Sequence, residues 1–196
     1  MSRRQFQLFH LFHLSRLLLL ACCLSAAFST AASALELTVD RVAGADGGKV
    51  YRIASSGTVA AAPAAVWRIL TDYNRMAEYV PDLKSARVVA RNGDKVIIEQ
   101  HGAARLLFFS RDIHLVVQVH EQAPNKIDVS LIEGDMKVYQ CSWELMPVAE
   151  TGGTRVLYNA TIEPKFYVPG VVGAGLVRKD IAKMMAAVLQ RLDQDE

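Results

Sequence analysis

The chain has 196 residues, a length that suits one domain or slightly more. With 52% hydrophobic and 21% charged residues it has the composition of a folded globular protein, which excludes a disordered, collagen-like or coiled-coil chain. The formal net charge of +2 depends on three arginines in the first 34 residues, and the rest carries 19 basic and 20 acidic side chains. Because residues 35–196 carry no excess of basic side chains, we expect no nucleic-acid partner.

Residues 1–34 have the pattern of a secretory signal peptide. An arginine-bearing start precedes the apolar run Leu17–Phe28, and small and polar residues follow up to Ala34. This order predicts cleavage after Ala34 and a periplasmic or secreted protein, and Ser2–Phe6 resembles a twin-arginine export motif. Two alternatives stay open, an uncleaved membrane anchor and a lipid anchor at Cys22.

The first part of the mature chain combines extended segments with two short helices. Apolar and polar residues alternate at the start of residues 35–48, which predicts an N-terminal strand and a glycine-containing turn. A second extended segment follows over residues 50–62. Pro63 favours the first turn of a helix that continues over residues 64–71, and a second short helix is expected over residues 74–79.

Residues 85–164 predict a run of antiparallel strands, because turn-forming residues separate segments in which apolar and polar residues alternate. Alternation of this kind indicates a sheet with one apolar and one wetter face. The residues that share the apolar face are Ile113, Leu115, Val117 and Val119, then Ile127, Val129 and Leu131, then Tyr139, Cys141, Trp143 and Leu145, and finally Val156, Tyr158, Ala160 and Ile162.

The chain closes with an amphipathic helix. Its apolar stripe steps by three or four residues through Val177, Ile181, Met184, Val188 and Leu192. Strands and helices are segregated along the chain, which predicts an α+β fold with this helix packed on the apolar face of a curved sheet.

Several short motifs carry a resemblance to a known superfamily: Ala62–Trp67, Leu70–Tyr73, Tyr79–Leu83, Ser142–Leu145 and Gly153–Tyr158. The chain resembles the START, polyketide cyclase and coenzyme Q-binding superfamily (SRPBCC proteins), and is most similar to its coenzyme Q-binding branch. The resemblance covers about residues 49–193. It implies the helix-grip fold, a curved antiparallel sheet of about seven strands round a long C-terminal α-helix, with two short helices after the first core strand.

The resemblance also implies an apolar cavity between sheet and helix, and the domain is expected over residues 49–196, after the 35–48 extension. Ligand pockets are mostly apolar with a few placed polar groups. The inward positions offer such a lining. The predicted ligand-binding residues are Leu115, Val117, Leu131, Glu133, Tyr139, Trp143, Tyr158, Val177, Ile181 and Met184.

These observations predict an exported, monomeric binding or transport protein for a lipid, isoprenoid or quinone-like molecule, with no cofactor. The glycines of Gly170–Gly175 are expected to let the entrance of the last helix approach the sheet or to act as a hinge over the cavity mouth. Lys165–Pro169, with Phe166 and Tyr167, is a candidate for an aromatic lip at the cavity or for transient membrane contact. One alternative is a cyclase- or dehydratase-like enzyme with Tyr139, Tyr158 or Glu133 in acid–base roles. The other is an interaction module, which the resemblance implies through ribosome-associating relatives. Few titratable residues face inward, which favours binding over catalysis.

Neither a metal site nor a reactive thiol is predicted. His114 and His120 share one strand but lie six residues apart, about 20 Å at 3.3 Å per residue. With His101 they are expected on the outer face of the sheet, and no zinc-type spacing of Cys and His occurs. Cys141, the one cysteine after the signal, lies in an apolar strand pattern and is expected to be buried and inert.

Overall fold

The structure is a computed structural model that describes residues 35–194 except for residues 45, 107–108 and 171. The predicted signal peptide, residues 1–34, lies outside the described residues. Among the helices of the described residues, none combines the length and the hydrophobicity of a membrane-spanning segment. The elements are β1 Glu36–Ala43, β2 Lys49–Val59, α2 Pro63–Leu70, η1 Tyr73–Glu78, β3 Leu83–Asn92, β4 Lys95–Leu106, β5 Phe109–Gln122, β6 Lys126–Gly134, β7 Met136–Pro147, β8 Thr154–Pro164 and α3 Gly173–Asp193.

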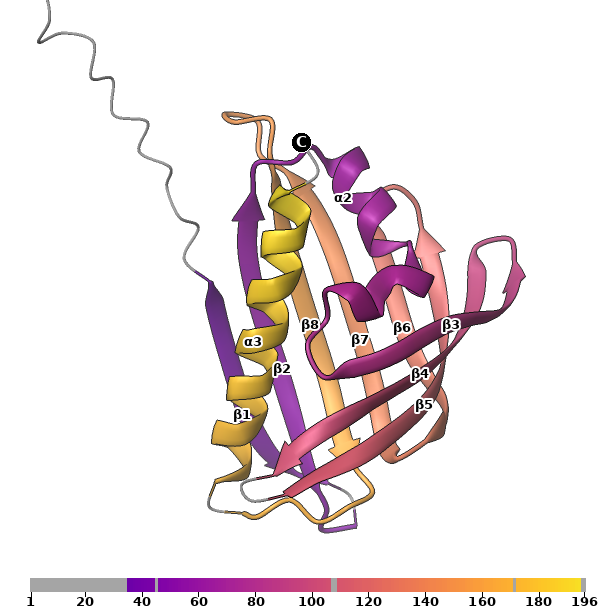
Figure 1. The fold of residues 1–196 in the computed structure, drawn as a ribbon. Helices are drawn as coiled ribbons and strands as arrows, with labels where there is room; N and C mark the ends of the chain where they lie inside the picture. The colour runs from indigo at the N-terminus through magenta and orange to yellow at the C-terminus, as the bar shows by residue number, and fades with distance from the viewer. Residues whose placement is uncertain (1–34, 45, 107–108, 171, 195–196) are drawn as a thin grey trace, which may run out of the picture. The chain divides into compact units, whose positions relative to one another are not determined.

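One antiparallel sheet of eight strands forms the body of the fold, in the order β1-β2-β8-β7-β6-β5-β4-β3. From β3 to β8 each strand pairs with the next along the chain, while β2 pairs with β8. The sheet bends, so that β3 to β5 run at a steep angle to β7 and β8 (Figure 1). The predicted helix-grip α+β fold is confirmed, and the extension over residues 35–48 supplies β1, which pairs with β2 at the sheet edge.

The sequence between β2 and β3 explains two short helices. Pro63 lies in the first turn of α2, where its missing N–H costs no hydrogen bond, and the helix buries Val66, Ile69 and Leu70. η1 is a 3-10 helix that begins one residue before the predicted segment and buries Tyr73. Since α2 packs on β7 and α3, these helices cover one end of the core.

The core lies between the inner face of the sheet, α2 and α3. Met185, Val188 and Leu192 of α3 are each at most 2% exposed, as are Ile98 of β4 and Val117 of β5. The apolar stripe of the last helix and the alternation in the strands therefore predicted the buried faces correctly, because burial of these apolar side chains is the main stabilising contribution.

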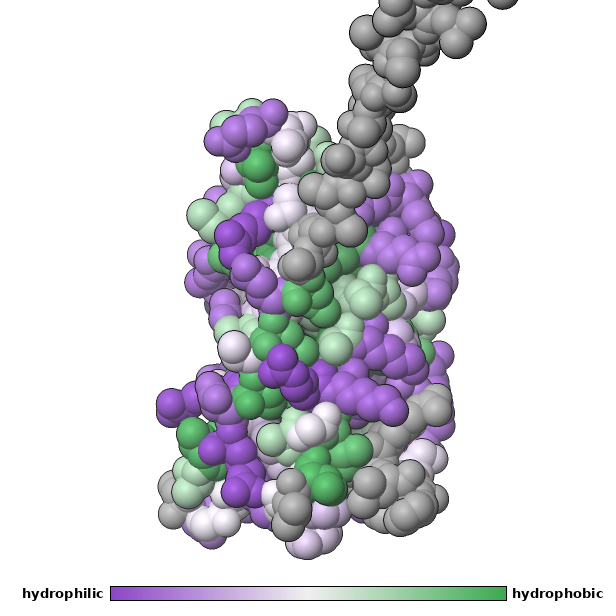
Figure 2. Space-filling model, turned by 90° about the vertical axis from the view of Figure 1, so that its left-hand side faces the viewer, coloured by the Kyte–Doolittle hydropathy of each residue, from purple (hydrophilic) through white to green (hydrophobic). Residues whose placement is uncertain are grey.

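A hydrophobic seam joins β1 to α3. Leu37 and Val39 of β1 belong to the same hydrophobic cluster as Val177 and Ile181 of α3. Figure 2 shows the side of the molecule on which β1 and α3 lie in Figure 1, and a column of apolar residues flanked by polar ones runs down it. The N-terminal extension therefore holds the outer flank of α3.

Candidate functional site

A cavity of about 320 Å³ lies inside the fold, between the sheet, α3 and the connection from η1 to β3. The side chains that line it are mostly apolar. Pockets for small ligands occupy roughly 300–1,000 Å³, so this space lies at the lower end of that range. It is large enough for a ring system or a short chain.

Eight of the ten predicted ligand-binding residues line this cavity. They come from the inward-facing positions of β5, β7 and β8 and from the apolar stripe of α3. Their contact with a ligand stays a prediction. The eight residues are Leu115, Val117, Tyr139, Trp143, Tyr158, Val177, Ile181 and Met184.

The other two predicted residues lie elsewhere. Leu131 packs against the main hydrophobic core, and Glu133 is exposed, so its predicted inward placement is wrong. The cause is a bulge in β6, since Val116 pairs with Glu133 whereas Val117 pairs with Leu131, which leaves Ile132 as an extra residue. The extra residue shifts the alternation by one, and Glu133 therefore lies on the outer face of the sheet.

Part of the lining was not predicted from the sequence. η1 and the turn after it cover one end of the cavity, and the segment that leads into α3 covers another part. The apolar residues of these segments were a usable signal, but their helical and irregular backbone gives no simple alternation. These additional lining residues include Tyr73, Met76, Tyr79, Val80, Leu83 and Leu176, while Phe166 and Val168 of the expected aromatic lip also line the cavity.

A buried polar trio occupies the inner face of β7 and β8. The side chains of Cys141, Tyr139 and Tyr158 line the cavity, and the thiol interacts with both tyrosine hydroxyls. Burial raises the pKa of Cys141 to about 12 and the pKa of Tyr158 well above its usual value of 10. The neighbouring Cys141 and burial raise the pKa of Tyr139 in the same direction. All three groups stay protonated at neutral pH, which suits hydrogen-bond donors rather than bases.

Two further tyrosines lie at the η1 end of the cavity. The Tyr73 hydroxyl donates to Glu121 Oε1 at 2.8 Å, and Arg91 Nη1 donates to the other oxygen of that carboxylate at 2.8 Å. Burial, aided by the bond to Glu121, raises the pKa of Tyr73 far above 10. Burial also raises the pKa of Tyr79 to about 12.

The rim of the cavity links α3 to the rest of the fold. Lys183 Nζ of α3 donates to Asp82 Oδ2 at 3.0 Å, and Asp82 lies in the turn between η1 and β3. At the start of α3, a Cβ on Gly173 would lie 2.5 Å from Tyr51 Oη. Only glycine permits this close approach, which agrees with the expectation that the glycines let the helix entrance approach the sheet. A hinge function for Gly170–Gly175 stays a prediction.

The residues before this entrance carry an exposed aromatic side chain. Tyr167 is 75% exposed, whereas its neighbours Phe166 and Val168 line the cavity. Lys49 Nζ lies 4.7 Å from the centre of the Tyr167 ring and donates to the Val168 carbonyl at 2.5 Å. The segment is thereby attached to β2 while one aromatic ring faces solvent.

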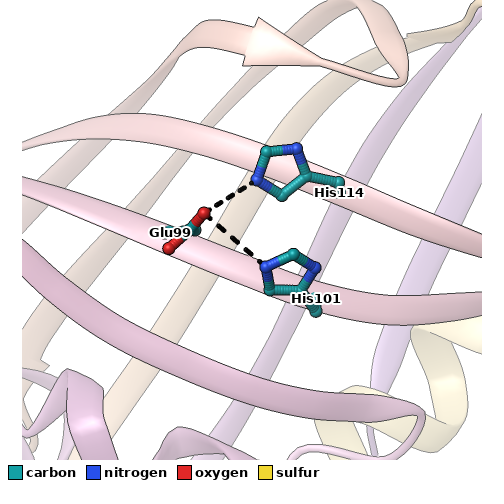
Figure 3. Close-up of side chains that lie close together, drawn as sticks. All are labelled: Glu99, His101 and His114. Atoms are coloured by element: carbon teal, nitrogen blue, oxygen red, sulfur yellow. Dashed lines mark hydrogen bonds and ion pairs between the residues drawn. The ribbon is translucent and has the colours of Figure 1, made fainter.

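The outer face of β4 and β5 holds a second polar group of residues. His101 and His114 are directly opposite each other in the register of these strands, and their rings stack with centroids 4.5 Å apart. Glu99 lies beside both (Figure 3). The expected outer placement of the histidines is confirmed, since each has a partly or largely exposed side chain. Their convergence was missed because the sequence does not give the register between strands.

An antiparallel sheet that grips a C-terminal helix over a mostly apolar cavity defines a START-like, helix-grip protein. A START superfamily protein from Mycobacterium smegmatis superposes with a TM-score of 0.63 at 19% identity, covering 73% of this chain and 97% of that one. The Zhui aromatase/cyclase from a Streptomyces species gives 0.62 at 12% identity, over 74% and 94% of the two chains. A STAR-related lipid transfer protein from Xanthomonas axonopodis gives 0.60 at 18% identity, over 80% and 99%.

The family follows from the sequence comparison. Residues 59–189 match the family described as polyketide cyclase/dehydrase and lipid transport, and the chain belongs to this family. A comparison with curated proteins gave no match. The structural similarities, all at or below 19% identity for the three proteins above, show the fold.

Proposed function

We propose that this protein binds and carries a small hydrophobic molecule of the lipid, isoprenoid or quinone-like class. The observation that carries this proposal is the mostly apolar cavity of about 320 Å³, whose buried polar groups are protonated hydroxyl and thiol groups. Burial of a CH₂ group contributes about 0.8 kcal/mol, so a five-carbon prenyl unit contributes about 4 kcal/mol without any hydrogen bond. Apolar burial can therefore dominate the affinity.

The size and polarity of the cavity narrow the ligand class. A long isoprenoid or acyl tail exceeds about 320 Å³, so it must leave past Phe166 and Val168 at the rim or displace α3. A quinone carbonyl accepts hydrogen bonds, which matches the tyrosine hydroxyls in the lining. The proposal also includes that the protein belongs to the coenzyme Q-binding branch and that Gly170–Gly175 acts as a hinge over the cavity mouth.

The relatives support binding, and one of them supports an enzyme as a second candidate. The Xanthomonas relative is named a lipid transfer protein, and the family description includes lipid transport. The Streptomyces relative is named an aromatase/cyclase. General acid–base catalysis works best with a pKa near the working pH. The tyrosine candidates here have pKa values raised away from neutrality, and Glu133 lies outside the cavity, so binding is the better supported function.

Export completes the proposal. The pattern of residues 1–34 supports secretion to the periplasm, and protein isolated from its own host should then begin at Leu35 in N-terminal sequencing. A start at Met1, with cytoplasmic retention of a reporter fused to residues 1–34, would favour the interaction-module alternative. The exposed Tyr167 ring beside the rim supports transient membrane contact, which vesicle sedimentation can test. Monomeric behaviour in solution stays a prediction for size-exclusion chromatography.

The decisive experiment identifies what the protein carries. We expect native mass spectrometry of the protein from its own host to show a bound species, which solvent extraction recovers as an apolar molecule. Met184→Trp fills part of the cavity and should lower the bound fraction at least fivefold. Met146→Trp is the matched control, because Met146 is 51% exposed. A wild-type protein without extractable ligand, or equal occupancy in both variants, would contradict the proposal.

A further inference from the structure

Glu99, His101 and His114 bring three metal-ligating atoms together on the outer face of the sheet. Glu99 and His101 are two residues apart on β4, so their side chains share a face, and the strand register places His114 of β5 opposite His101. Both imidazoles direct Nε2 at the same carboxylate oxygen, Glu99 Oε1, at 3.6 Å from His101 and 3.2 Å from His114 (Figure 3). Two adjacent strands thus supply a preformed group of two nitrogens and one oxygen.

We propose that these three side chains bind a divalent transition-metal ion, Zn²⁺ in the first instance. One ligand atom from each residue lies within 4.8 Å of the other two. Ligands about 2.1 Å from a tetrahedral ion lie about 3.4 Å apart, and the two nitrogen-to-oxygen distances lie on either side of that value. Binding requires the two stacked imidazoles, whose planes lie 21° apart, to turn so that both nitrogens face one ion.

A neighbouring arginine holds the Glu99 carboxylate in an orientation that suits metal binding. Arg87 of β3 donates to Glu99 Oε2, which leaves Oε1 directed at the two imidazoles. The Arg87 hydrogen bond thereby fixes the orientation of the carboxylate, as outer partners of metal ligands commonly do.

The donor set selects among metals. Imidazole nitrogens suit zinc, copper and nickel, whereas calcium and magnesium prefer oxygen ligands. The side chains of His101, His114 and Glu99 are 51%, 38% and 25% exposed, so an ion can enter from solvent. Three protein ligands leave a fourth position of a tetrahedral ion for water.

This site is separate from the cavity of the proposed function. Ile98, Gln100 and Leu115, which alternate with the three ligands on β4 and β5, line the cavity on the other face of the sheet. Loss of the metal ligands should therefore leave binding of a hydrophobic dye in the cavity unchanged. Failure of either proposal does not decide the other.

Calorimetric titration of Zn²⁺ into the tag-free, chelator-treated full chain tests the proposal. We expect one more bound ion per chain in the wild type than in the double variant H101A/H114A, and at least tenfold weaker affinity in either single variant. Glu99→Gln should also weaken binding at least tenfold, because it removes the ligand charge. Cys22, Cys23 and the N-terminal histidines are present in every variant, so the difference reports this site alone.

His120→Ala is the matched control. His120 lies on β5 six residues from His114, is similarly exposed and interacts with Asp94 at 2.9 Å. Its loss should leave Zn²⁺ binding within twofold of the wild type. With Co²⁺, the wild type should gain visible absorption of a tetrahedral site that the double variant lacks, while circular dichroism of both stays the same. Equal titrations for wild type and H101A/H114A, or an equal loss in His120→Ala, would overturn the proposal.

Discussion

Two alanine substitutions on α3 distinguish a packed helix end from a helix segment that borders empty space. Leu192 is fully buried in the main core and does not line the cavity, whereas Ile181 is partly buried and lines it. Both substitutions remove a comparable number of carbon atoms. We expect Leu192→Ala to lower the free energy of unfolding by about 2–5 kcal/mol, because it loses transfer free energy and creates a void.

Ile181→Ala should cost less. Its side chain faces a cavity of about 320 Å³, so it already lacks packing partners on one side, and we expect a loss below about 1.5 kcal/mol. For a chain of this size, 1 kcal/mol changes the melting temperature by about 2–4 °C. Thermal unfolding followed by circular dichroism should therefore separate the two variants clearly.

Ligand binding should show the opposite order. A fluorescent anilinonaphthalene sulfonate dye serves as a hydrophobic probe of the cavity. Ile181→Ala removes up to three apolar carbons from the lining, worth at most about 2.4 kcal/mol, and should weaken dye binding several-fold. Leu192→Ala should leave the dye affinity within twofold. If Ile181→Ala destabilises the protein as much as Leu192→Ala and leaves dye binding unchanged, side chains fill the cavity in solution and Ile181 does not border empty space.

Three further outcomes follow from single contacts. Iodoacetamide at pH 8 should alkylate Cys141 at least about 100-fold more slowly in the folded than in the unfolded protein, because the pKa of the buried thiol is raised to about 12. Mass spectrometry of the Cys141 peptide measures both rates, and equal rates would contradict the burial of Cys141. Gly134→Ala should cost at least about 2 kcal/mol in urea unfolding, because φ is +133° and a Cβ would lie 2.2 Å from the His114 carbonyl oxygen; a neutral effect would contradict this backbone geometry. Tyr73→Phe should cost about 1–2 kcal/mol in the same assay through loss of the bond to Glu121, and an unchanged midpoint would show that this bond is absent in solution.

The sequence predicted those parts of the site that depend on regular periodicity. Val177, Ile181 and Met184 follow the helical stripe, and Tyr139 and Tyr158 follow the alternation of regular strands, so their inward placement could be derived. The face that a side chain takes in a regular element depends only on spacing along the chain. Packing of a helix on a curved sheet then brings these faces together.

The other parts of the site depend on features that the residue pattern of one helix or strand does not reveal. Glu133 was misplaced because a bulge inserts Ile132 and changes the face of every later residue in β6. The covering of the cavity by η1 depends on where an irregular segment packs. The contact of His101 with His114 depends on the register between β4 and β5, which two separate alternation patterns leave undetermined.

The buried face limits that register. A slip of one residue in β4 would expose Ile98 to solvent and place Glu99 and His101 against the cavity, at the cost of burying polar groups among apolar side chains. The buried face therefore excludes a one-residue slip, and the register that forms pairs His101 with His114 on the exposed face. An exposed cluster whose cross-strand spacing is held by the core can bind an ion without the ordering cost that two independent surface side chains would have.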